Sequence, residues 1–143
     1  MSRNASFNVE HYHSGDLTNQ EVTTSRVDAS LKPSMRNVYR NGQCHALALA
    51  IHHQAGHPIG VVHLWGSPNH FFNYDKNDHS MGIDVDGRRP VKDIVKEYGE
   101  SHRQVTPNYV MKKTSEEKWL NAHHEAAHAV APTVLNTLTS PTK

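Results

Sequence analysis

The chain has 143 residues and a formal net charge of +1 at pH 7, a length that accommodates one ordinary domain and excludes two. Leu, Ile, Val and Phe make up just under a fifth of it, and the mean hydropathy is -0.72, so these side chains can fill a core of about half the chain. Near-neutral charge removes the long-range attraction that binders of nucleic acid or anionic membranes usually have. We therefore expect a globular middle with polar ends, and neither nucleic acid nor a membrane as a partner.

The first 35 residues are rich in Ser, Asn and Thr, and we predict a weakly structured arm with two candidate edge strands at 7–9 and 21–27. The longest apolar run, residues 46–51, is far shorter than the roughly 20 residues that span a bilayer. The first residues also lack the apolar stretch of a secretory signal. The sequence therefore predicts a cytoplasmic protein.

The middle of the chain shows the strongest secondary-structure signals. Residues 44–55 have helical spacing, and Gly56 followed by Pro58 predicts the end of that helix. Residues 59–65 form an apolar, Val-rich run typical of a buried strand, and segments 69–74 and 81–85 predict a hairpin. This order predicts an α+β fold in which the helix bearing Cys44 packs on a small antiparallel sheet.

The C-terminal third is predicted to hold two further helices and one strand. Pro90 stands where a first-turn proline would, and Val91, Ile94 and Tyr98 share one helical face. A strand is expected at 105–111, and Thr114 with Glu117 predicts a capping box for a last helix that Pro132 should stop. Residues 36–131 would then form a single domain, followed by a frayed tail at 132–143.

Cys44 is the only cysteine of the chain, which excludes an internal disulfide. It shares the predicted inward face of its helix with Leu47 and Ile51, whereas His45, Leu49 and His52 are expected on the exposed side. The unpaired N–H groups of a first helical turn favour the thiolate and can stabilise an oxyanion. Cys44 is thus a candidate nucleophile, or alternatively a small core residue.

A nucleophilic thiol needs a base, and that base needs a group that orients it. His70 begins the first strand of the predicted hairpin, and Asp84 lies in the second, so antiparallel pairing can place them side by side. Alternation also allows Asp84 to face solvent. Asp86 is the substitute for Asp84, although the turn at Gly87 explains it as well, and His79 is the main rival to His70.

This pattern resembles the Cys, His, Asp core of transglutaminase-like proteins, which are relatives of the papain-like cysteine hydrolases. The resemblance covers about residues 40–98: Gly42 and Cys44 open an Ala-rich helix, a His begins the second strand and an Asp follows in the third. It implies a catalytic-type domain in which Cys44 is the nucleophile, His70 the base and then the acid, and Asp84 the group that orients the imidazole. Gln43, directly before Cys44, is the candidate for oxyanion stabilisation or support.

A second motif points to a different chemistry. The segment from His124 through Glu125 to His128 matches HExxH, in which two zinc ligands lie one helical turn apart and the glutamate is a general base. No His, Asp, Glu or Cys follows in residues 133–143 as a third ligand. The apolar stripe of this helix includes Trp119, and both histidines point away from it.

The sequence thus favours a cysteine-dependent hydrolase or acyl-transfer enzyme that acts on amide bonds of a protein or peptide, whether as peptidase, amidase, deamidase or transglutaminase. This enzyme would need no cofactor. The alternatives are a zinc metallopeptidase that uses His124, Glu125 and His128, and a non-catalytic binding protein on the same scaffold.

Overall fold

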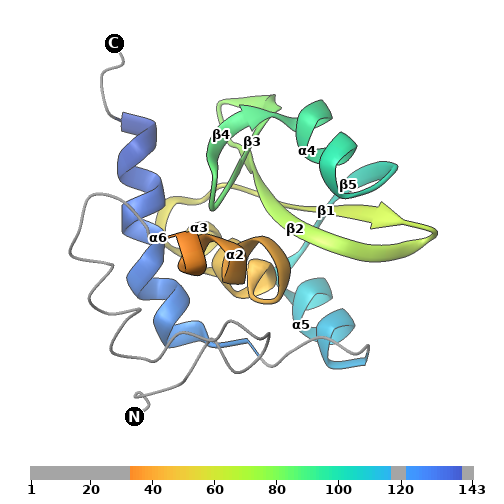
Figure 1. The fold of residues 1–143 in the computed structure, drawn as a ribbon, viewed down its shortest axis with the longest axis horizontal. Helices are drawn as coiled ribbons and strands as arrows, with labels where there is room; N and C mark the ends of the chain where they lie inside the picture. Colours follow the sequence, from red (N-terminus) through yellow and green to blue (C-terminus); the bar gives the residue numbers. More distant parts are fainter. Residues whose placement is uncertain (1–32, 117–121, 140–143) are drawn as a thin grey trace.

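The fold comes from a computed structural model that describes residues 33–116 and 122–139. In chain order the elements are α2 (Pro33–Asn41), α3 (Cys44–Ala55), β1 (Ile59–Leu64), β2 (Ser67–Asp75), β3 (Asp78–Asp84), β4 (Gly87–Pro90), α4 (Val91–Tyr98), β5 (Ser101–Val105), α5 (Pro107–Glu116) and α6 (His124–Thr139). The strands form one antiparallel sheet in the order β4-β3-β2-β1-β5 (Figure 1). The predicted α+β class with an antiparallel sheet is confirmed.

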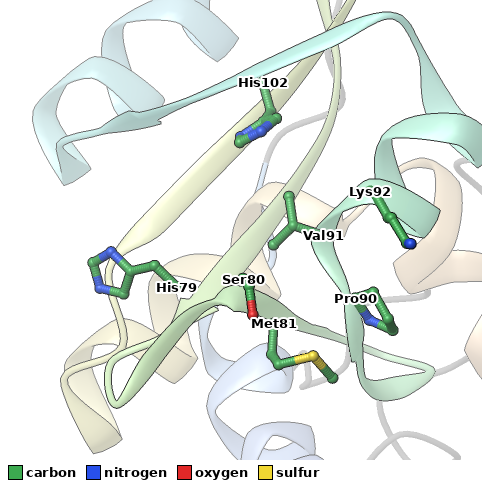
Figure 2. A pocket seen from close by; sticks show the side chains of 7 residues that line it. All are labelled: His79, Ser80, Met81, Pro90, Val91, Lys92 and His102. Carbon is green, nitrogen blue, oxygen red and sulfur yellow. The ribbon is translucent and has the colours of Figure 1, made fainter.

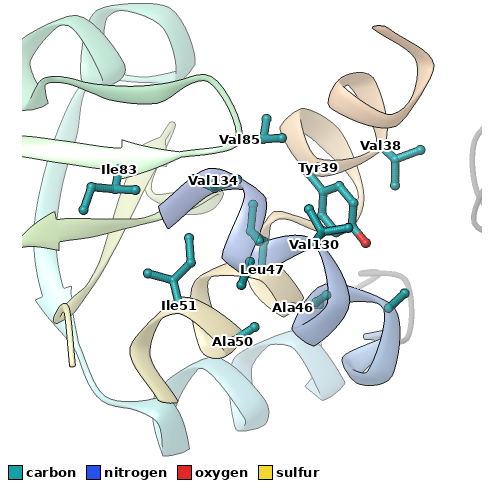
Figure 3. Close-up of a cluster of buried hydrophobic side chains, with 13 residues drawn as sticks. Val38, Tyr39, Ala46, Leu47, Ala50, Ile51, Ile83, Val85, Val130 and Val134 are labelled. Carbon is teal, nitrogen blue, oxygen red and sulfur yellow. The ribbon is translucent and has the colours of Figure 1, made fainter. Parts of the chain in front are cut away.

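Strand alternation divides the core between the two faces of the sheet. Val61 of β1 and Phe71 of β2 pack against α3, whereas the next residues, Val62 and Phe72, pack against α4 on the opposite face (Figure 1). On the α3 side, α6 and α2 add a second layer, and buried side chains from α2, α3, α6 and β3 form one cluster there (Figure 3). Cys44 therefore begins a helix that is enclosed between the sheet and other helices.

Helix α3 has the bounds that its apolar spacing predicts. It ends because Gly56 takes a left-handed conformation, with φ of 79°, and donates its N–H to the carbonyl of His52. The expected exposure of His45 and Leu49 is wrong, since these side chains are only 1% and 3% exposed. The reason is that α3 has helices on more than one side, so its buried surface is wider than a single stripe.

The segment after β5 corrects the predicted strand at 105–111. The sheet ends at Val105, and Pro107 begins α5 because its fixed φ suits a first helical turn. Thr106 caps that helix by accepting the N–H of Tyr109 on its Oγ1 at 3.0 Å. Thr114 does not begin a helix either: it lies in α5 and donates its hydroxyl to the carbonyl of Val110 at 2.7 Å.

Helix α6 corrects the predicted stop at Pro132 and, over residues 132–139, the frayed tail predicted at 132–143, since it continues to Thr139. Residues 140–143 lie outside the described part of the chain. A proline inside a helix leaves the carbonyl four residues earlier without its usual donor. Here that carbonyl belongs to His128, and Gln54 of α3 donates its Nε2–H to it at 2.9 Å. Val134, beyond the proline, is buried in the core. Tertiary contacts thus carry the helix through Pro132.

The N-terminal boundary differs as well. Helix α2 begins at Pro33, inside the arm predicted to be weakly structured, and it buries Val38 and Tyr39 in the core. The candidate strands at 7–9 and 21–27 lie outside the described residues, as do Glu117 and Trp119. Within the described part of the chain, no helix combines the length and the apolar character that crossing a bilayer requires.

Candidate active site

The candidate site lies where β2 and β3 separate. Their ladder pairs Asn73 with Ile83 and ends there, so the first part of β2 has no partner in β3. The start of α3 lies beside this part of β2, and the N–H of Phe71 donates to the Cys44 Sγ at 3.4 Å. Sheet divergence therefore makes room for the thiol against the strand that carries His70.

The structure brings His70 and Asp84 together inside the protein. The Nε2 atom of His70 lies 3.1 Å from the Asp84 Oδ2, and the two side chains are only 0% and 3% exposed. Asp84 thus does not face solvent. Its second oxygen, Oδ1, accepts the N–H of Asp86 at 3.0 Å, which fixes the carboxylate plane.

The other ring nitrogen of His70 also faces an acceptor. Its Nδ1 lies 3.2 Å from the backbone carbonyl oxygen of Arg40, a residue of the last turn of α2. A doubly protonated imidazole donates from both nitrogens, one to Arg40 and one to Asp84. The surroundings of His70 therefore favour the imidazolium form.

The thiol and the imidazole shift each other's proton affinity. Burial raises the pKa of Cys44, but hydrogen bonds and charge interactions with His45 and His70 outweigh it and lower this pKa to about 6. Burial likewise lowers the pKa of His70, yet its interactions with Asp84 and Cys44 raise that pKa to about 9. These opposite shifts favour a thiolate beside an imidazolium at neutral pH.

Residues of β4 and α4 complete the surroundings of the pair. Arg89 of β4 donates from a guanidinium nitrogen to the Asp84 Oδ2 at 3.1 Å and pairs with Glu97 at 2.7 Å. Burial raises the pKa of Asp84, but the hydrogen bond and charge of His70 and the charge of Arg89 together lower it. Asp84 therefore stays ionised beside the imidazole.

Tyr98, the last residue of α4, stacks face to face on His70, with ring centroids 3.6 Å apart and planes 7° apart. The following residue, Gly99, lies close to β1, because a Cβ there would overlap the backbone carbonyl of His63. The tyrosine ring thus covers the imidazole on one face and restricts its rotation. The sequence had placed Tyr98 only on the apolar face of a helix.

Three other candidate residues lie elsewhere. Gln43 is buried and accepts the backbone N–H of His123 on its Oε1 at 2.9 Å, so its side chain links the starts of α3 and α6. Asp86 holds the guanidinium of Arg40 through both carboxylate oxygens and is therefore engaged away from His70. His79 is the second residue of β3, at the end of that strand opposite Asp84.

Sequence reasoning missed four contributors, namely Arg40, His45, Arg89 and Tyr98. His45 alone carried a chemical signal, as an ionisable residue next to the cysteine. Its helical spacing predicts an exposed side chain, but His45 is buried and interacts with the Cys44 thiol. The carbonyl of Arg40 and the stacking ring of Tyr98 depend on the packing of α2 and α4, which no local pattern reveals.

The HExxH residues lie on the outer side of α6. His124, Glu125 and His128 are exposed, and the His128 Nδ1 lies 3.0 Å from the Gln54 Nε2 while its ring stacks on that of His53. Among the described residues, no group of three or more His, Cys, Asp or Glu side chains is arranged to hold a metal ion.

Comparison with known proteins gives no assignment: no family model, curated protein or solved structure matches this chain. The geometry of Cys44, His70 and Asp84 is therefore the basis for a functional proposal.

Proposed function

We propose that this protein is a cysteine-dependent hydrolase or acyl-transfer enzyme acting on amide bonds of a peptide or protein. The observation that carries the proposal is the position of His70, whose imidazole interacts with the Cys44 thiol and lies 3.1 Å from Asp84. This order of nucleophile, base and orienting acid is the one that covalent acyl transfer uses.

In the proposed reaction the Cys44 thiolate attacks the carbonyl carbon of the substrate, and a C–S bond forms. His70, as the imidazolium, then gives its proton to the leaving amine, so that the C–N bond breaks and a thioester remains. Water or a second amine next attacks the thioester carbon and gives its proton to His70. The C–S bond breaks and the thiolate returns, which restores the starting state.

The start of α3 supports stabilisation of the negative oxygen in this reaction. Cys44 is the first residue of the helix, and N–H groups of a first turn have no acceptor within the helix. The backbone N–H of Cys44 is the donor that we assign to the oxyanion. Gln43 would support this turn through its bond to His123.

Burial places a condition on the proposal. Cys44 is 2% exposed and His70 is 0% exposed, so a substrate carbonyl reaches the sulfur only after a local opening of the surrounding chain. A small activated acyl donor is thus a better first probe than a folded protein.

The experiment that tests the proposal is capture of the thioester. The protein is mixed with p-nitrophenyl acetate at neutral pH, and intact mass spectrometry follows an acetyl group that hydroxylamine removes. We expect acetylation at Cys44 that turns over in the wild type, since His70 activates water. Added glycine ethyl ester then separates hydrolysis from transfer to an amine.

Two variants decide the result. Cys44→Ser should lose the hydroxylamine-sensitive adduct, and His70→Gln should slow its formation by roughly 10² or more, the usual contribution of a general acid–base group. If a chelator abolishes activity and the Cys44→Ser variant is still active, the result would instead support the metallopeptidase alternative. Equal acetylation of wild type and His70→Gln would refute the role of His70, and no adduct at all would favour a non-catalytic binding protein.

A further inference from the structure

The sheet face that carries α4 is only partly covered by that helix. Helix α4 has eight residues, and beside its first turn the structure contains an open pocket with a volume of about 510 Å³ (Figure 2). Pockets that bind small molecules commonly have about 300–1,000 Å³. The size of this pocket therefore suits a small ligand.

The walls of the pocket combine apolar surface with positively charged or ionisable nitrogen groups. Met81 of β3 lies opposite Pro90 and Val91 at the start of α4, and Val91 is 4% exposed. Lys92 stands on the α4 side, and His79 and His102 stand on the strand side (Figure 2). An apolar body would fit against the first three, and a negative group would pair with the others.

No carboxylate belongs to the lining in the part of the chain that the structure describes. Asp78, the neighbour of His79 in β3, accepts the hydroxyl of Ser80 at 2.7 Å and lies 3.8 Å from a guanidinium nitrogen of Arg88. Asp93 is in the first turn of α4 but does not line the pocket. A ligand carboxylate would therefore meet the Lys92 ammonium group and two imidazoles without an acid in the lining to compete.

One of these imidazoles is fixed by a residue beneath it. The hydroxyl of Tyr74 lies 2.7 Å from the His102 Nδ1, and Tyr74 is 5% exposed. The rings of Tyr74 and His79 are also in contact, with centroids 5.5 Å apart. The buried phenol thus holds His102 in place, so that its other ring nitrogen is the one left for a ligand.

We propose that this pocket binds a small carboxylate with an apolar body, whose charge pairs with Lys92 and whose body packs on Met81 and Val91. Such a carboxylate belongs either to a free organic acid or to the C-terminal residue of a peptide. The site is separate from Cys44, because the pocket residues of β3 lie at the end of that strand opposite Asp84. Its test is thus independent of the proposed reaction.

The test is a titration of the ¹⁵N-labelled protein with 3-phenylpropionate, followed by NMR chemical shifts. We expect saturable shifts at the backbone amides of Met81, Val91 and His102, and weaker binding of the neutral 3-phenylpropanamide. An N-acetylated dipeptide ending in phenylalanine forms a second arm. The arm with the higher affinity identifies the free acid or the peptide terminus as the source.

Two lysine variants provide the matched comparison. Lys92→Gln should weaken binding of the carboxylate about fivefold or more, because a charge-assisted contact is lost, and should leave the amide unaffected. Lys96→Gln, an exposed residue of the same helix that does not line the pocket, should change neither. Absence of saturable shifts at the pocket, equal affinity for acid and amide, or an unchanged affinity in Lys92→Gln would each overturn the proposal.

Discussion

Asp84 and Asp86 are two residues apart, yet they have different partners. Asp84 is buried against His70, whereas Asp86 binds Arg40 with an Nε–Oδ2 distance of 2.9 Å. Alternation along the strand allowed either acid to meet the imidazole, so the sequence alone did not separate them. Which acid meets His70 depends on the position of the last turn of α2, because Arg40 in that turn pairs with Asp86 and leaves Asp84 beside His70.

This difference leads to a prediction about the two acids. Asp84→Asn removes the charge that stabilises the imidazolium, so we expect the pKa of His70 to fall below its value of about 9. A neutral His70 no longer favours the Cys44 thiolate, the form that reacts with iodoacetamide. Alkylation of Cys44 at pH 7 should then slow by roughly tenfold or more. Asp86→Asn is the matched control and should have a much smaller effect. A larger effect of Asp86→Asn would mean that the carboxylate roles are reversed; the readout is the alkylation rate by mass spectrometry.

At the scale of single elements, prediction from sequence succeeded where the local signal and the packing agreed. Helix α3 and the hairpin of β2 and β3 have strong periodicity and clear turn residues, and the structure contains them. The predicted helix start at Thr114 and helix end at Pro132 are wrong, because contacts with neighbouring elements outweigh the local capping and proline signals there. Gln54 satisfies the carbonyl that Pro132 leaves open, and Thr106 with Pro107 begins a helix earlier than the capping box suggested.

Helix α4 is the element that holds Tyr98 against His70, and Ile94 is its main anchor. Ile94 is 0% exposed and packs with Val62 and Phe72. We expect Ile94→Ala to lower the free energy of unfolding by about 2–4 kcal/mol, as large-to-small changes in a core do. Urea denaturation measures this change.

The same variant should also disturb the site, because loosening α4 releases the ring that covers His70. Lys96→Ala, an exposed position of the same helix, is the control and should stay within about 0.5 kcal/mol of the wild type. Loss of less than about 1 kcal/mol in Ile94→Ala would show that α4 is not docked through this residue.

For the molecule as a whole, the pH dependence of stability is set by more than the candidate site. The pKa of Cys44 is lowered by folding, so the contribution of this thiol to the free energy of unfolding grows as pH rises from about 6 to 9.0. The pKa of His70 is raised, so its contribution is lost as pH rises from 6.5 to about 9. These two trends oppose each other, and the site alone should leave stability nearly level across this window.

Acidification should act through His57 instead. Burial, the largest influence, lowers the pKa of His57, and its Nδ1 accepts the backbone N–H of Lys76 at 3.1 Å. The unfolded chain therefore takes up this proton more readily, and stability falls as pH drops through about 6.5. We expect a lower melting temperature at pH 5.5 than at pH 7.5, a range assigned from the usual histidine pKa of about 6.5.

The variant His57→Asn separates this residue from the other histidines. Asparagine retains a side-chain oxygen that can accept the Lys76 N–H, but it does not titrate. The decrease in melting temperature on acidification should therefore be smaller in His57→Asn than in the wild type. An unchanged decrease would assign the effect to other groups, such as His124, whose pKa is lowered by partial desolvation of its exposed ring and by the charges of His45, His128 and His53.

The central claim is that Cys44 and His70 form an ion pair, and the most direct measurement is the ultraviolet absorbance of the thiolate as a function of pH. The spectrum of Cys44→Ser is subtracted at each pH, so that only this sulfur contributes. We predict that the wild-type thiolate appears with a midpoint near pH 6, and that in His70→Ala the midpoint moves up toward the ordinary value of 9.0. A wild-type midpoint at or above 9.0, unchanged in His70→Ala, would contradict the account.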